Sequence, residues 1–89
     1  MSLSVFIPSQ LRSYTAGAAE VQAQGATLAD VLADLERQFG GIRFRVIDEQ
    51  DRVRPFIVLF VGSERQEDLT APIPAGCRAV HIVGALSGG

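Results

Sequence analysis

The 89 residues of the chain suffice for one small domain and leave no room for a second hydrophobic core. Eight arginines against ten carboxylates give a formal net charge of −2, and no basic cluster could follow a phosphate backbone, so nothing favours a nucleic-acid partner. A single cysteine excludes an internal disulfide, and no apolar run approaches the roughly 20 residues that cross a bilayer. The opening MSLSVFIPSQ also lacks the layout of a signal peptide. We therefore expect a cytoplasmic protein without a metal, a bound cofactor or a membrane partner.

The first predicted elements are two strands of a hairpin. Apolar residues alternate with others through residues 2–7, which predicts a half-buried strand that Pro8 ends. A turn region from Arg12 to Gly17 then leads to a return strand over residues 19–23, and Gly25 ends that strand.

The clearest element is an amphipathic helix over about residues 27–39. Thr27 stands where an N-cap belongs and Asp30 follows three residues later, which approximates a capping box. Gly40 and Gly41 supply the stop. The apolar positions recur at the spacing of one helical face and are Leu28, Val31, Leu32, Leu35 and Phe39.

The second half of the chain predicts a connection and two more strands. Residues 42–53 mix apolar and charged side chains, which indicates an irregular connection with a helical turn and a tight loop. Residues 56–61, FIVLFV, and residues 79–83 have the composition of strands. The loop between them has Leu69 and Ile73 as its expected anchors. Four arginines around the connection are interpreted as solvating and steering groups: Arg43, Arg45, Arg52 and Arg54.

The order strand, strand, long helix, strand, strand favours an α+β domain with the helix across one face of a mixed sheet. The commonest arrangement with this order is a β-grasp roll, here with four to five strands. Its first and last strands would lie side by side in the centre. We expect one domain over residues 1–89, with a flexible C-terminal tail over about 84–89.

The uninterrupted apolar run FIVLFV raises the question of what its second face contacts. If every other residue from Ile57 faces the helix, the residues between them point outward. An exposed aromatic side chain beside β-branched residues would suit the docking of partner enzymes, although covering loops or sheet propensity alone would also explain the run. The predicted partner-binding residues are Val58, Phe60, His81, Val83 and Leu86.

Two side chains of reactive types, a histidine and a cysteine, have no assigned reaction in our interpretation. His81 has no second histidine in the sequence to complete a metal site, which favours a surface or interface histidine. Cys77 lies in a predicted turn with Arg78 as its only basic neighbour, which favours an inert thiol. The acidic residues Glu64, Glu67 and Asp68 are most simply explained as a solvated loop.

The chain ends in Leu86, Ser87, Gly88 and Gly89. These glycines are either a frayed end with no role or a thin tail whose terminal carboxylate is the reactive group. Without Cβ atoms, the tail could enter a channel too narrow for other residues. A carboxylate is a poor acyl donor, so it must first be activated, for example by adenylation with ATP. A sulfur nucleophile could then convert the mixed anhydride to a thiocarboxylate, and this chemistry needs no catalytic side chain of the chain itself.

Motifs along almost the full chain carry a resemblance to a known family. The opening IPSQLRSYTAG, Thr27-Leu28 in the helix, Phe60-Val61 in the apolar run and the closing Gly88-Gly89 are the main ones. The sequence resembles the MoaD/ThiS-type ubiquitin-like sulfur carriers. The branch that delivers sulfide for cysteine synthesis looks closest, and the small subunit of molybdopterin synthase is the near alternative. Further matching positions are Gly41-Ile42, Arg45, Asp48-Glu49, Pro74-Ala75-Gly76, Val80 and Ile82.

The resemblance implies a carrier or co-substrate protein rather than an enzyme. A partner would adenylate Gly89 with ATP, with Ser87 and Gly88 as the adjoining tail, and a sulfur-accepting biosynthetic enzyme would take the sulfide. Two other functions stay open. The chain could be a ubiquitin-like modifier that is joined to target lysines through Gly89, or a plain binding subunit whose glycine end is incidental. Because all of its basic side chains are arginine, it could not form lysine-linked chains of itself.

Overall fold

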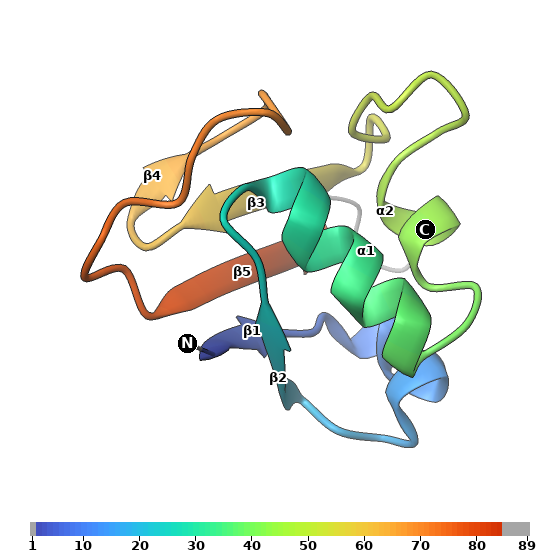
Figure 1. Cartoon of the computed structure of the whole chain (residues 1–89). Helices are drawn as coiled ribbons and strands as arrows, with labels where there is room; N and C mark the ends of the chain where they lie inside the picture. The colour runs from blue at the N-terminus through green and yellow to red at the C-terminus, as the bar shows by residue number, and fades with distance from the viewer. Residues whose placement is uncertain (1, 85–89) are drawn as a thin grey trace.

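A computed structural model describes residues 2–84 of the chain. One five-stranded mixed sheet has a long helix across one of its faces (Figure 1). The strand order is β2-β1-β5-β3-β4. In chain order, the elements are β1 (Ser2–Phe6), the 3-10 helix η1 (Ser9–Thr15), β2 (Glu20–Gln24), α1 (Leu28–Gln38), α2 (Arg43–Val46), β3 (Ile57–Val61), β4 (Glu64–Arg65) and β5 (Ala79–Gly84).

The centre of the sheet is β5. It pairs in parallel with β1 and antiparallel with β3, so the first and last strands are neighbours as the β-grasp prediction requires. Two antiparallel pairs, β1 with β2 and β3 with β4, extend the sheet to its edges. β5 is paired on both sides over residues 79–81, whereas residues 82–84 pair with β3 alone, and this pairing holds the chain in the sheet up to Gly84.

The core lies between the sheet and α1. Alternate residues of β1, β3 and β5 are buried, and the predicted apolar stripe of α1 covers them. Burial of Leu69, with Ile73 packed against the core, confirms the two loop anchors. The fully buried large side chains are Val5, Ile7, Leu28, Val31, Leu32, Leu35, Ile42, Val46, Ile47, Leu59 and Val80.

Both ends of α1 are fixed by side-chain oxygens that accept backbone hydrogen bonds. The Thr27 hydroxyl accepts a bond from the Asp30 N–H at 3.2 Å, which confirms the predicted N-cap. Near the other end, the Glu36 carboxylate accepts bonds from the N–H groups of Gly41 at 2.8 Å and Arg43 at 3.0 Å. These bonds hold the pKa of Glu36 below its ordinary value, and the bond from the Gly41 N–H has the largest effect. They fasten the start of α2 to α1.

Two stretches differ from the sequence-based expectation. A 3-10 helix occupies Ser9–Thr15, where a turn from Arg12 to Gly17 was expected. It buries Leu11, and the Pro8 carbonyl accepts a bond from the Leu11 N–H at 2.9 Å. The expected 62–76 loop contains the two-residue strand β4, because Gly62 adopts a φ of +63° and turns the chain back along β3. A strand of two residues is too short to show a periodic pattern.

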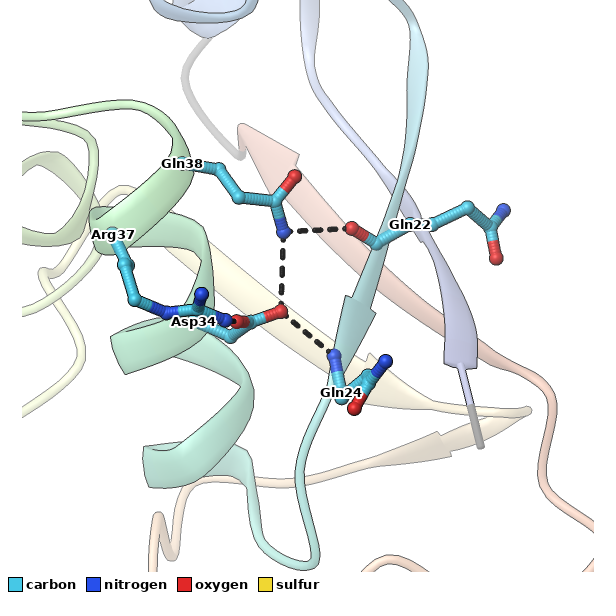
Figure 2. A network of polar contacts seen from close by, with 5 residues as sticks. All are labelled: Gln22, Gln24, Asp34, Arg37 and Gln38. Atoms are coloured by element: carbon cyan, nitrogen blue, oxygen red, sulfur yellow. Dashed lines mark hydrogen bonds and ion pairs between the residues drawn. The ribbon is translucent and has the colours of Figure 1, made fainter.

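A buried carboxylate on α1 covers part of the open edge of the sheet (Figure 2). Asp34 accepts a hydrogen bond at 2.9 Å from the backbone N–H of Gln24, in the edge strand β2. Gln38 donates to the Gln22 carbonyl at 2.9 Å and to Asp34 at 3.1 Å. The guanidinium of Arg37 forms an ion pair with the same carboxylate. These side chains satisfy edge groups that would otherwise be open to another strand.

We expect Asp34→Ala to lower the free energy of unfolding by about 1–3 kcal/mol, because it leaves the Gln24 N–H without its acceptor. The matched control is Arg37→Ala. The Arg37 side chain is 76% exposed, so this substitution removes an ion pair that contributes little to stability. Urea denaturation of the two variants checks the difference, and equal losses would show that the edge contact is not the stabilising one.

Candidate functional site

The predicted reactive end departs from the central strand. Gly84 is the last residue of β5 and lies opposite Ile57 in the register with β3. Gly84, at which the flexible tail was expected to begin, therefore belongs to the sheet. A Cβ atom on Gly84 would overlap the side-chain amide of Gln10, so η1 contacts the end of β5 directly. Leu86, Ser87, Gly88 and Gly89 lie outside the described residues, and their predicted roles stay predictions.

The five strands carry a row of paired residues whose side chains lie on the face of the sheet opposite α1. His81 on β5 lies at its centre, paired with Phe6 of β1 on one side and Phe60 of β3 on the other. The rings of Phe6 and His81 are stacked, with centroids 4.7 Å apart and an interplanar angle of 8°. Glu20 and Arg65 continue the row on the edge strands. The row is therefore aromatic in the middle and charged at its ends.

A second pair, Val58 with Val83, lies beside this row toward the end of β5. Val83 is 40% exposed and Phe6 is 36% exposed, whereas Val58, Phe60 and His81 are half-buried. The alternating burial of β3 and β5 confirms the predicted orientation of the four described candidates. We call this surface the outer face and define it by Phe6, Val58, Phe60, His81 and Val83.

Sequence reasoning missed Phe6 as a member of the outer face. Its alternation with Val5 and Ile7 did place it on the side away from the core. What the alternation could not supply is the register between β1 and β5, two strands at opposite ends of the chain. That register sets Phe6 against His81.

The remaining candidates offer no second site within residues 2–84. Over that range, no group of three His, Cys, Asp or Glu side chains could hold a metal ion. Cys77 is half-buried in the loop before β5, and its thiol donates to the Ala79 carbonyl at 3.4 Å. Among the described helices, none is long and apolar enough to cross a membrane.

Comparison with known proteins identifies the family. The chain is 34% identical to the sulfur carrier protein CysO of Mycobacterium tuberculosis, in an alignment of 93 positions that covers all of both chains. It belongs to the CysO-like sulfur carriers of the MoaD/ThiS type. No protein-family model matches the chain.

Solved structures of such carriers have the same fold. One chain of the Amycolatopsis orientalis BexX/CysO complex is 32% identical with a TM-score of 0.86, over 98% of this carrier and 99% of that chain. M. tuberculosis CysO is 32% identical with a TM-score of 0.84, over 94% and 99%. The small archaeal modifier protein 1 of Haloferax volcanii, at 21% identity and a TM-score of 0.79 over the full length of both chains, shares the β-grasp fold.

Proposed function

We propose that this sulfur carrier works through the carboxylate of Gly89, which a partner enzyme activates with ATP. A carboxylate oxygen attacks the α-phosphorus of ATP, and pyrophosphate leaves. Hydrosulfide then attacks the acyl carbon, a C–S bond forms, and AMP leaves as the C–O bond breaks. The product is a thiocarboxylate in which sulfur replaces one oxygen. Its sulfur then attacks an activated carbon of the acceptor's substrate, and a C–S bond forms as the bond from that carbon to its leaving group breaks. Hydrolysis of the resulting thioester leaves the sulfur on the substrate and returns the carboxylate of Gly89.

The observation that supports this proposal is the position of β5. β5 is paired on both sides over residues 79–81 and with β3 up to Gly84, and this pairing fixes the point at which the described chain ends. The full-length alignment with a protein named as a sulfur carrier supports the same role. That name also favours the branch we associated with cysteine biosynthesis over the molybdopterin branch. No side chain of the body is needed as a catalyst, since each step occurs at the carboxylate and the partner supplies the groups that act on it.

Mass spectrometry of the C-terminal tryptic peptide tests the proposal. Cleavage after Arg78 releases residues 79–89, which contain neither cysteine nor methionine. After incubation with the activating enzyme, ATP and sulfide, we expect this peptide to gain the mass difference between sulfur and oxygen and to become alkylated by iodoacetamide. Omission of ATP is the control. Recovery of residues 79–89 on lysines of other proteins, without a thiocarboxylate, would instead support a protein modifier.

We further propose that the outer face docks the partner enzymes. Half-buried and exposed apolar side chains around a stacked aromatic pair form the kind of centre that dominates binding energies. The crystallised BexX/CysO complex shows that a carrier of this family associates with another protein. For this carrier, the outer face lies on the same sheet that presents the end of β5.

We expect Phe60→Ala to raise the KM for the carrier in the activating reaction by roughly tenfold, with little change in kcat, because an anchor of the docked complex is lost. Arg37→Ala is the control, since it removes a large exposed side chain from α1 on the opposite face. Circular dichroism establishes that both variants are folded. An unchanged KM for Phe60→Ala would rule out a docking role for this residue.

A further inference from the structure

The four arginines of the connection between α1 and β3 fall into two pairs. Arg43 forms an ion pair with Asp51 at 2.9 Å, and Arg52 forms one with Asp48 at 3.9 Å. Within residues 2–84, the guanidinium groups of Arg45 and Arg54 make no ion pair with any carboxylate. The sequence shows one cluster of four cations, whereas the structure places a carboxylate within ion-pair distance of only two of them, Arg43 and Arg52.

Each of these two guanidinium groups is held in place by its Nε atom. Arg45 Nε donates to the Tyr14 hydroxyl at 2.6 Å, and the guanidinium lies 5.8 Å from the centre of that ring. Arg54 Nε donates to the Phe44 carbonyl at 2.6 Å. Among the described residues, the Nη atoms of both donate no hydrogen bond. The two guanidinium groups are thus oriented before any partner binds, and their Nη–H groups are available to donate hydrogen bonds to a carboxylate.

Arg45 and Arg54 line the same groove. Its walls come from η1 and from the residues that lead into β3, including Tyr14 and Phe56, whose side chain is 41% exposed. The groove adjoins the end of β5, because two of its lining residues contact that end: Ile57 pairs with Gly84, and the Gln10 amide lies over Gly84. Gly84, the last residue that the structure describes, therefore lies beside this groove.

We propose that this groove docks a carboxylate-rich segment of the protein that takes up the C-terminal residues. Two oriented guanidinium groups beside the half-buried Tyr14 and the exposed Phe56 have the composition of an interface, and their charge, which no ion pair within residues 2–84 neutralises, is complementary to an acidic chain. The identity of the partner rests on the proposed function, whereas the preference for carboxylates rests on the groove alone. The groove is separate from the outer face, which contains none of its residues.

Titration of the ¹⁵N-labelled full-length chain with a hexaglutamate peptide tests the proposal by NMR. We expect shifts at the side-chain Nε–H signals of Arg45 and Arg54 and at nearby backbone amides. A hexaglutamine peptide should give none. Inorganic phosphate that binds the groove as tightly as hexaglutamate would overturn the proposal in favour of a small-anion site, and so would an absence of shifts.

Two double variants from the same segment provide a matched comparison. Arg45→Gln with Arg54→Gln should weaken hexaglutamate binding roughly tenfold, and Arg43→Gln with Arg52→Gln by less than about twofold, although the charge removed is the same. Equal weakening would show that only net charge matters and would overturn the proposal. If the first double variant does not fold, the single variants Arg45→Gln and Arg54→Gln serve the same comparison.

A chain lacking Gly88 and Gly89 separates this inference from the proposed function. It should bind hexaglutamate like the intact chain, since the groove is built from residues 10–57. In the intact chain, sulfur transfer that fails while the peptide still binds would count against the thiocarboxylate proposal alone. Sulfur transfer that proceeds without any peptide binding would count against the groove alone.

Discussion

A variant that lacks Gly88 and Gly89 is expected to fold like the intact chain and to receive no sulfur. The buried core residues that the structure describes lie within residues 3–82, and β5 ends at Gly84, so all of them remain in the deletion variant. The thiocarboxylate proposal, by contrast, requires the carboxylate to reach the activating site of another protein. Shortening the chain by two residues withdraws it by about 7 Å of extended backbone.

The measurement is the mass of the C-terminal tryptic peptide after incubation with the activating enzyme, ATP and sulfide. We expect the shortened peptide to keep its starting mass. Ser87→Ala is the control, because it alters the same segment without changing its length or its last two residues. Sulfur incorporation by the deletion variant would exclude every mechanism that depends on the two glycines, including conjugation to lysines.

Among alanine substitutions of the glycines that the structure describes, we expect Gly25→Ala to destabilise the fold most. Gly25 links β2 to α1, and its Cβ would lie 2.6 Å from the Val31 nitrogen and 2.9 Å from the Asp30 carbonyl carbon. These are backbone atoms of the helix and cannot rotate away, so the helix or the strand must shift. We expect a loss of about 3 kcal/mol in the free energy of unfolding, and therefore a Tm roughly 10–20 °C lower.

Gly40→Ala is the matched control for this prediction. A Cβ on Gly40 would have no heavy atom within 4 Å, and its φ lies outside the left-handed region. The same methyl group should therefore change the Tm little. Differential scanning calorimetry of both variants checks the difference. If Gly25→Ala unfolds at the same temperature as Gly40→Ala, the close approach of helix and strand is not a constraint on the fold.

The comparison with Gly84 shows that a close contact alone does not determine how much stability is lost when a glycine is replaced by alanine. A Cβ there would overlap Gln10, but the obstacle is the far end of a flexible, exposed side chain. Gln10 can move aside at little cost. The glycine that is required for stability is the one that faces backbone.

Local patterns were sufficient for the elements and for the faces they present. The 3.6-residue period predicted α1. The period of two in a strand put Ile57, Leu59 and Val61 on one face of the run FIVLFV, and their burial identifies it as the core face. These features depend on residues a few positions apart, so the sequence displays them directly. The order of the elements predicted the β-grasp arrangement with β1 beside β5.

Other features depended on contacts between segments far apart in the chain. The stacking of Phe6 on His81 follows from the register of two strands about 75 residues apart, a separation at which no local pattern reports pairing. The sequence alone does not distinguish Arg45 from Arg43. They differ in the structure because Arg45 Nε donates to the hydroxyl of Tyr14, 31 residues earlier, whereas Arg43 forms an ion pair with Asp51. The sequence alone thus determined the elements, their inward faces and the glycine end. Only the tertiary structure decided which outward side chains meet and which charges stay uncompensated, because both depend on long-range packing.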